Sequence, residues 1–189
     1  MTLPARVLPR EPWRTGILAV VAGGAIVAAM FALTRPNSSI PTTVSGTAAV
    51  GSMAPNFTTQ QLDGSALRLE AFKGKPVLIN FWATSCAPCQ TEMPAIENQR
   101  QRHAADGLTV VAIDYRETDR AAMQKFLAGV GVHFDVGLDP DAKIATAYGV
   151  TIGLPVSVFV ERSGAVSYIQ LGQMSEDVLT QHLESILSS

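Results

Sequence analysis

The hydrophobic positions of this chain form one long apolar run, followed by a series of short apolar segments separated by polar ones. Residues 16–33 carry no charged side chain, and a helix over them covers about 27 Å, close to the hydrocarbon thickness of a bilayer. We therefore predict a transmembrane helix over 16–34. A flexible tether rich in Pro, Ser and Thr is expected over 35–50 and a folded domain over 51–189.

The charges around the apolar run predict how it is oriented. Arg6, Arg10 and Arg14 precede it and only Arg35 follows closely, so the positive-inside rule places residues 1–15 in the cytoplasm. The chain is then a single-pass protein of the cell (inner) membrane with a periplasmic or otherwise extracytoplasmic domain. A cleaved signal peptide is an alternative, although the run exceeds the usual apolar region of about 7–15 residues. A second alternative to the transmembrane helix is a buried core helix, although such helices are rarely so uniformly apolar.

The segments beyond residue 50 alternate between two periodicities. Short, nearly continuous apolar runs are typical of strands in a sheet that is covered on both faces, and apolar positions three and four apart are typical of helices. The predicted strands are 56–61, 66–69, 77–82, 108–114, 134–137, 156–160 and 166–171. The predicted helices are 88–105, 119–130, 141–148 and 175–187, with Asp119 and Ser175 as N-terminal caps. This order predicts an α/β three-layer sandwich: a mixed central sheet with helices on both faces, preceded by an N-terminal hairpin.

Composition narrows the class of partner. Charged residues make up 16% of the chain, hydrophobic residues 47%, and the formal net charge is −2. Residues 1–50 hold four of the 14 Lys and Arg but one of the 16 Asp and Glu, so the predicted domain is mildly acidic. Such a domain is not steered toward phosphates, and nucleic acid is not expected as a partner.

The reactive chemistry is concentrated in residues 79–89, Ile-Asn-Phe-Trp-Ala-Thr-Ser-Cys-Ala-Pro-Cys, which hold the only two cysteines. A buried strand leads into a tight turn, and Cys86 lies just ahead of the helix that Pro88 opens. Free backbone N–H groups and the helix dipole at that end favour the thiolate form of Cys86. Cys89, one turn into the helix, is expected to be the more buried, resolving thiol. The pattern predicts a redox-active pair.

Two other interpretations of the cysteine pair are weaker. Zinc takes about four ligands, but only two cysteines exist and His103, His133 and His182 are scattered along the chain. A purely structural disulfide across so small a loop removes little entropy from the unfolded chain. We expect neither a metal nor a cofactor.

Six motifs make the sequence resemble the thioredoxin superfamily. Within it, the resemblance is to TlpA/ResA-like membrane-anchored thiol–disulfide oxidoreductases with an AhpC/TSA-Redoxin-like domain. The motifs are Gly51-Ser-Met-Ala-Pro-Asn-Phe57, Phe72-Lys-Gly-Lys-Pro76, Asn80-Phe-Trp-Ala-Thr84, Cys86-Ala-Pro-Cys89, Glu92-Met-Pro94 and Gly153-Leu-Pro155. The resemblance covers residues 51 to about 187. It implies a thioredoxin-like fold in which residues 116–140 form an extra helix and strand.

The resemblance also implies a role for each matching residue. Cys86 attacks the disulfide of a partner, Cys89 releases the partner, and Pro155 is a cis-proline that faces the pair. Plain thioredoxin has a buried aspartate where this chain has Asn80, and an amide cannot take a proton from Cys89. Glu92 matches a glutamate that accepts this proton in ResA-like members, which makes it the candidate catalytic acceptor. The alternative for Glu92 is a surface residue of the helix.

The expected substrate-facing surface departs from the family at two places. Its predicted residues are Trp82, Ser85, Ala87, Pro88, Leu154 and Pro155. Ser85 replaces the tryptophan that commonly precedes the first cysteine, which makes this surface flatter and more polar. Residues 148–155 are one residue longer than the usual approach to the cis-proline. Trp82 and Phe81 are also expected in the core and the wall of the site, and Asp114 and Asp139 as turn and cap residues.

By the same resemblance, the expected partners are exported proteins with disulfides, such as apocytochrome c, and a membrane thiol electron donor of the DsbD/CcdA type. The expected direction is reductive, because cysteines in an oxidising compartment otherwise stay oxidised. A copper-handling chaperone is an alternative that needs a Cys-x-x-x-Cys pair and a distal histidine. His133 is instead predicted in a loop. A thiol peroxidase is another, but residues 81–86 lack the proline of its Pro-x-x-x-Thr-x-x-Cys motif.

Overall fold

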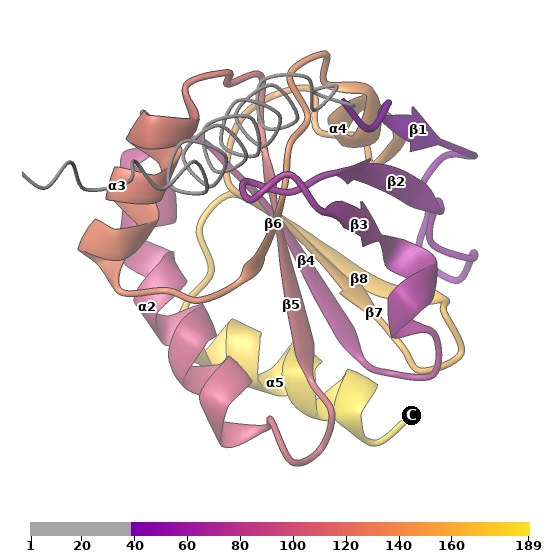
Figure 1. Cartoon of the computed structure of the whole chain (residues 1–189). Helices are drawn as coiled ribbons and strands as arrows, with labels where there is room; N and C mark the ends of the chain where they lie inside the picture. The colour runs from indigo at the N-terminus through magenta and orange to yellow at the C-terminus, as the bar shows by residue number, and fades with distance from the viewer. Residues whose placement is uncertain (1–38) are drawn as a thin grey trace, which may run out of the picture. The chain divides into compact units, whose positions relative to one another are not determined.

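A computed structural model describes residues 39–189, with a mixed five-stranded sheet at its centre (Figure 1). The strand order is β6-β5-β4-β7-β8. Strands β4, β5 and β6 are parallel, and β7 is antiparallel to both β4 and β8. Their bounds are β4 Val77–Trp82, β5 Thr109–Asp114, β6 Asp135–Gly137, β7 Val156–Val160 and β8 Val166–Leu171. The predicted mixed sheet is confirmed.

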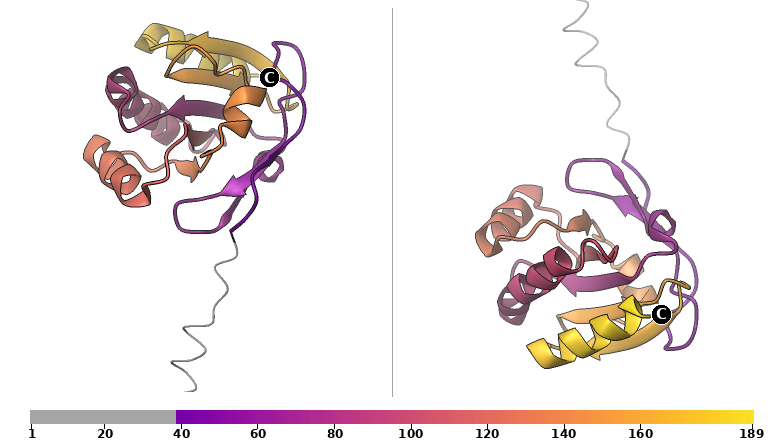
Figure 2. Two further views of the ribbon diagram at one scale, coloured as in Figure 1. Left: turned by 90° about the horizontal axis from the view of Figure 1, so that it is seen from above. Right: turned by 90° about the horizontal axis from the view of Figure 1, so that it is seen from below.

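The helices cover both faces of this sheet, as predicted. Their bounds are α2 Ala87–Arg102, α3 Arg120–Val130, α4 Lys143–Ala147 and α5 Glu176–Leu187. Side chains alternate between the faces of a strand, so Leu78 and Trp82 of β4 pack with apolar residues of α2, α3 and α5. Ile79 and Phe81 point the other way, toward α4 and a second, small sheet. Figure 2 shows the three long helices on one side of the central sheet and the small sheet (indigo) on the other.

The small sheet contains the predicted hairpin and one strand more. It is formed by β1 Thr43–Val44, β2 Phe57–Gln60 and β3 Ala66–Arg68, and the short helix η1 Leu69–Phe72 follows. Strand β1 lies within residues 35–50, where the sequence predicts a flexible tether. It pairs with β2, and the Ala48 N–H donates to the Ala147 carbonyl over 2.7 Å. Val44 and Ala48 also pack against the core, so the part of this stretch from Thr43 onward joins the fold.

Local signals set the helix ends. Asp119 and Ser175 cap α3 and α5 through side-chain oxygens that accept from Ala122 N–H and Val178 N–H, as predicted. Helix α2 ends three residues earlier than the predicted end at residue 105, with His103 as its C-cap. The insertion of one helix and one strand within residues 116–140 is present as α3 and β6.

Among residues 39–189, no helix is long and apolar enough to cross a membrane. The predicted transmembrane helix, 16–34, and the predicted cytoplasmic segment, 1–15, lie outside the described residues.

Candidate active site

The cysteine pair lies where β4 gives way to α2 at the carboxyl end of the central strand. Cys86 N–H donates to the Ala83 carbonyl over 3.1 Å, which closes the turn between the two elements. Cys86 is the N-cap of α2, and its Sγ accepts the Cys89 N–H over 3.2 Å. The sulfur therefore occupies the position where a helix start favours negative charge, as the sequence predicts.

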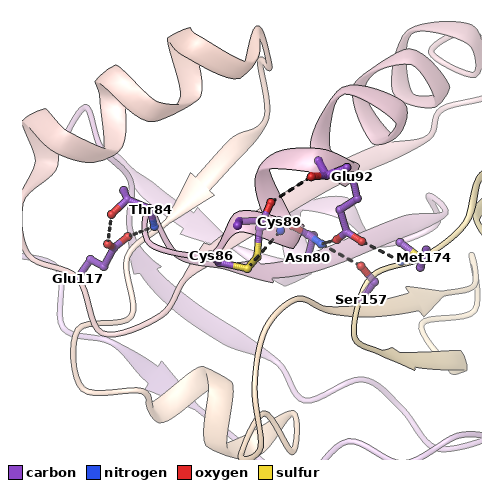
Figure 3. The surroundings of a disulfide bond; sticks show 10 residues. Asn80, Thr84, Cys86, Cys89, Glu92, Glu117, Ser157 and Met174 are labelled. Carbon is purple, nitrogen blue, oxygen red and sulfur yellow. Dashed lines mark hydrogen bonds between the residues drawn. A yellow bond between two sulfur atoms is a disulfide. The ribbon is translucent and has the colours of Figure 1, made fainter.

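Cys86 and Cys89 are joined by a disulfide, with an S–S distance of 1.98 Å and a Cα–Cα distance of 5.3 Å (Figure 3). Cys86 is half-buried, whereas Cys89 is 0% exposed. An incoming thiol or thiolate can thus reach only the Cys86 sulfur from solvent. The predicted greater burial of Cys89 is confirmed.

The Leu154–Pro155 peptide is cis, and it directly precedes β7, the antiparallel neighbour of β4. Leu154 packs into the apolar cluster that includes Cys86 and Cys89, so the fold brings this segment to the cysteine pair. The Pro155 carbonyl accepts the Gly172 N–H over 2.9 Å. The contact of Leu154 and Pro155 with substrate stays a prediction.

The residues predicted to face substrate fall into two groups. Ser85 and Ala87 are exposed, and Pro88 and Leu154 are half-buried, so these four contribute to the surface around Cys86. Trp82 differs, because it is 0% exposed and stacks on Phe126 of α3 with ring centroids 5.1 Å apart. Trp82 is therefore part of the core below the site and not of its surface, and Pro155 is buried as well.

Glu92 lies on α2, three residues after Cys89, and both side chains are buried. Its Oε1 accepts from Asn80 Nδ2 over 2.9 Å, and its Oε2 accepts the Met174 N–H over 3.1 Å. The side chain is 4% exposed, so the interpretation of Glu92 as a surface residue is wrong. Burial raises the pKa of Glu92, while the bonds from Met174 and Asn80 partly oppose that shift.

The polar network around Glu92 extends to Ser157, a residue that the sequence patterns did not predict to lie at the site. Asn80 Nδ2 also donates to Ser157 Oγ over 2.9 Å, and Ser157 is the residue of β7 directly opposite Asn80 (Figure 3). Ser157 is the one polar residue of the buried strand Val-Ser-Val-Phe-Val. That interruption of an apolar run was the available signal, because an isolated buried hydroxyl requires a partner.

A second missed residue, Glu117, holds the turn before the cysteines. Its carboxylate accepts the Thr84 N–H over 2.9 Å and also the Thr84 hydroxyl. Glu117 N–H in turn donates over 3.0 Å to Asp114, whose other oxygen accepts the Asp139 N–H over 2.7 Å. Burial raises the pKa of Asp114 to about 6. Asp139 accepts from Ala145 N–H at the start of α4, so the predicted turn and cap roles of Asp114 and Asp139 are confirmed.

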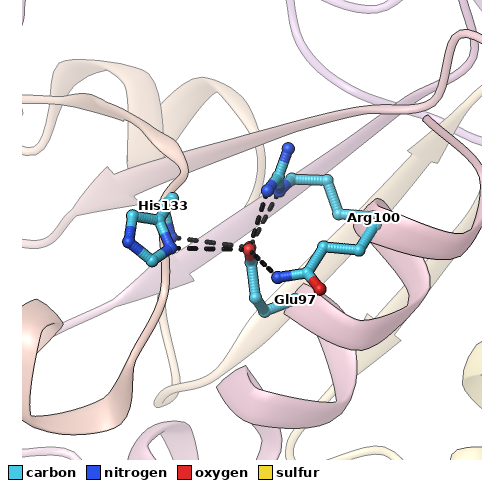
Figure 4. A network of polar contacts seen from close by, with 4 residues as sticks. Glu97, Arg100 and His133 are labelled. Carbon is cyan, nitrogen blue, oxygen red and sulfur yellow. Dashed lines mark hydrogen bonds and ion pairs between the residues drawn. The ribbon is translucent and has the colours of Figure 1, made fainter.

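Another polar cluster joins α2 to the segment before β6 (Figure 4). Glu97 accepts two hydrogen bonds from Arg100 and one from Gln101, all within 2.8 Å. The His133 N–H donates to the same carboxylate over 3.5 Å, and the exposed His133 ring lies 3.6 Å from it. His133 is therefore a loop residue, as predicted. Within residues 39–189, no group of three or more His, Cys, Asp or Glu side chains could hold a metal ion.

A mixed sheet with helices on both faces, a cysteine pair at a helix start and a cis-proline beside it define a thioredoxin-like thiol–disulfide oxidoreductase. The chain belongs to the Redoxin family, whose profile matches residues 49–187.

Curated relatives carry the same activity in their names. The thiol-disulfide oxidoreductase ResA of Bacillus thuringiensis subsp. konkukian is 35% identical over 137 residues, 72% of this chain and 78% of the relative. ResA of Bacillus subtilis is 35% identical over 136 residues, 72% of this chain and 75% of the relative. These matches show that the chain is a thiol–disulfide oxidoreductase of the ResA type.

Solved structures agree with this assignment. A secreted disulfide oxidoreductase of Mycobacterium tuberculosis, homologous to Escherichia coli DsbE, is 26% identical with a TM-score of 0.61. That match covers 68% of this chain and 95% of the mycobacterial one. A thiol:disulfide interchange protein of the thioredoxin family from Chlorobium tepidum is 26% identical with a TM-score of 0.65, over 74% of this chain and 98% of that one.

Proposed function

We propose that this chain is a membrane-anchored, extracytoplasmic oxidoreductase that acts chiefly as a reductant of disulfides in exported proteins. The observation that carries the catalytic part is the unequal burial of a joined cysteine pair, with Cys86 accessible at the helix start and Cys89 enclosed next to Glu92. This arrangement gives the two sulfurs different tasks.

The proposed cycle starts from the reduced pair. The Cys86 thiolate attacks one sulfur of the partner disulfide, forming a mixed disulfide and releasing the second partner sulfur as a thiolate. Cys89 passes its proton to Glu92 and attacks the Cys86 sulfur. This breaks the mixed disulfide, releases the other partner thiolate and re-forms the Cys86–Cys89 bond. Two electrons have then moved from the enzyme to the partner, and a membrane thiol donor of the DsbD/CcdA type restores the reduced pair.

The proposed location rests on the uncharged run at 16–33 and the arginines that precede it. The secreted mycobacterial relative supports it, because an oxidoreductase of this fold operates there outside the cytoplasm. In such a compartment a dedicated reductant is needed for proteins whose cysteines must be reduced, and apocytochrome c is the substrate we propose.

The direction of electron flow is tested by the reduction potential of the Cys86–Cys89 pair in the full chain. We expect a value nearer the thioredoxin potential of about −270 mV than the DsbA potential of about −120 mV. A potential in the DsbA range would contradict a reductive role and would favour an enzyme that forms disulfides.

The assignment of the two sulfurs is tested by trapping in membranes. Cys89→Ser removes the resolving thiol, so mixed disulfides with partner proteins are expected to accumulate on Cys86. The matched variant Cys86→Ser should trap little, because Cys89 is enclosed. Partners captured mainly on Cys89 would reverse the assignment, and the trapped proteins identify the substrates.

A further inference from the structure

One amide atom in the buried network has two partners, and the other has none. Asn80 Nδ2 lies 2.9 Å from both Glu92 Oε1 and Ser157 Oγ. Asn80 Oδ1 is fully buried and has no hydrogen-bond partner among the described residues. Because an unpaired buried carbonyl oxygen is costly, this side chain is held where Glu92 and Ser157 need it and not where its own bonds would be best satisfied.

A buried group that takes up and returns a proton needs suitable partners in both states. Ionised Glu92 only accepts hydrogen bonds, and Asn80 Nδ2 and the Met174 N–H supply them. Neutral Glu92 carries one O–H. The Met174 N–H still faces Oε2, so the new hydrogen belongs on Oε1, where an N–H group of Asn80 cannot accept it.

A half-turn of the Asn80 amide resolves this conflict with little change of shape, because its oxygen and nitrogen exchange places. Oδ1 then lies within reach of both Glu92 Oε1 and Ser157 Oγ and accepts an O–H from each. Ser157 suits both orientations, since a hydroxyl can accept from Nδ2 or donate to Oδ1 by rotating its hydrogen. One amide group is unpaired in either orientation, Oδ1 in the first and the two N–H groups in the second.

We propose that Asn80 and Ser157 form an amide switch. The Asn80 side-chain amide makes a half-turn when Glu92 gains or loses a proton, so that Glu92 has a hydrogen-bond partner in both protonation states. Both are positioning residues, and their part in catalysis rests on the proposed role of Glu92 as proton acceptor for Cys89. Glu92 is hydrogen-bonded to Asn80 from the sheet and to the Met174 N–H from the segment before α5. Ser157 is bonded to Asn80, and Cys89 lies three residues before Glu92 on the same helix.

The switch is tested by NMR of the full chain in detergent, oxidised so that the cysteines do not titrate. We expect the nuclear Overhauser signals between the Asn80 side-chain N–H protons and Ser157 to be lost at the same midpoint at which the Glu92 carboxyl carbon titrates, because the turn moves Nδ2 away from Ser157. In Glu92→Gln, which is neutral at every pH, the Asn80 signals should show no such midpoint. Asn80 signals that stay constant through the Glu92 midpoint would overturn the proposal.

The part of Ser157 is tested by a matched pair of variants. Ser157→Ala leaves one Asn80 N–H without an acceptor when Glu92 is ionised, so the measured Glu92 pKa should rise above that of the wild type. Ser157→Thr keeps the hydroxyl and should restore the wild-type value. Equal pKa values in all three proteins would remove Ser157 from the switch.

The outcomes separate the switch from the proposed function. Suppose that Glu92→Gln has the same pH–rate profile of thiol exchange as the wild type, while in the wild type the Asn80 signals follow the Glu92 titration. The acceptor role then fails and the switch stands. If the profile changes but the Asn80 signals stay constant, the acceptor role stands and the switch fails.

Discussion

A carboxyl group enclosed next to a disulfide must either stay neutral or find donors for its charge. Glu92 has both options, because burial raises its pKa while Met174 N–H and Asn80 stabilise the ionised form. At the scale of the residue, the site therefore places a buried carboxyl three positions after Cys89, within the same buried face of α2. Plain thioredoxin has a buried aspartate on the strand, where this chain has Asn80, whereas the buried carboxyl of this chain lies on α2.

The first prediction concerns Glu92→Gln. A raised pKa means that Glu92 accepts a proton only above a pH higher than its ordinary range, so oxidation of the reduced wild type should accelerate as pH rises through that midpoint. The variant should lose this rise and react about 100-fold more slowly at neutral pH, the lower end of general-base contributions. Stopped-flow thiol exchange across pH measures both, with Glu184→Gln on the exposed side of α5 as control. Identical profiles would exclude Glu92 as acceptor.

At the scale of the element, hydrogen bonds also connect the part of α2 that follows the cysteines to a neighbouring segment. Glu97 is buried and accepts hydrogen bonds from Arg100, Gln101 and His133 N–H, which joins α2 to the segment before β6 (Figure 4). The hydrogen bonds from Arg100 contribute most to lowering the pKa of Glu97 to about 2. The ionised form is thus the one that the folded state favours.

The second prediction follows from this shift. The stability that Glu97 contributes is fully present above its ordinary pKa of 4.5 and is lost as pH falls toward about 2. Glu97→Gln should lower the free energy of unfolding at neutral pH by about 2 kcal/mol, typical for hydrogen bonds to a charged group. In this variant the free energy of unfolding should also depend less on pH between those two values. Urea unfolding at a series of pH values tests this, with exposed Glu176→Gln as control, and an unchanged acid dependence would contradict it.

The turn between β4 and α2 gives a third prediction, for Glu117. Its carboxylate accepts two hydrogen bonds from Thr84, and an amide oxygen at this place could serve only one of them without turning an N–H toward the other. Glu117→Gln should therefore cost about 1 kcal/mol of stability and Glu117→Ala about 2 kcal/mol. Thermal unfolding of the oxidised variants measures this order. Unchanged stability in both variants would mean that the turn between β4 and α2 does not depend on Glu117.

At the scale of the whole molecule, the small sheet closes the face of the central sheet opposite the three long helices. Its outermost strand, β1, comes from the stretch that the sequence predicts as a tether. Ser45 N–H and Ala48 N–H bond to the Asn56 and Ala147 carbonyls, which attaches this stretch to the hairpin and to α4. The folded unit accordingly begins before Gly51.

The fourth prediction compares two shortened chains. A chain that begins at Ser39 keeps β1. A chain that begins at Gly51 loses the backbone hydrogen bonds of β1 and of Ala48 and the apolar contacts of Val44 and Ala48. We expect the shorter chain to be less stable by about 2–4 kcal/mol, from hydrogen bonds of about 1 kcal/mol each and the lost apolar burial. Equal melting temperatures of the two chains would mean that residues 39–50 add nothing to the stability of the fold and act only as a tether.

Most strands and helices follow from the sequence alone, because their signals are local. The nearly continuous apolar run at 77–82 and the caps at Asp119 and Ser175 act over a few neighbouring positions, and the structure confirms them. Strand β1 was missed because two residues carry no periodicity of their own. They become a strand only through the partner that β2 provides.

The cysteine spacing and the proline at the helix start by themselves determined that this protein has a redox pair, with Cys86 outward and Cys89 inward. Only the tertiary structure decided which hydrogen bonds hold Asn80 and Glu92 in place near that pair. Asn80, Glu92 and Ser157 belong to three different elements and meet because β4, α2 and β7 pack together. The physical reason is that burial and hydrogen bonding across elements, which set the charge state of Glu92, are properties of the packed interior and leave no periodic signal in the sequence.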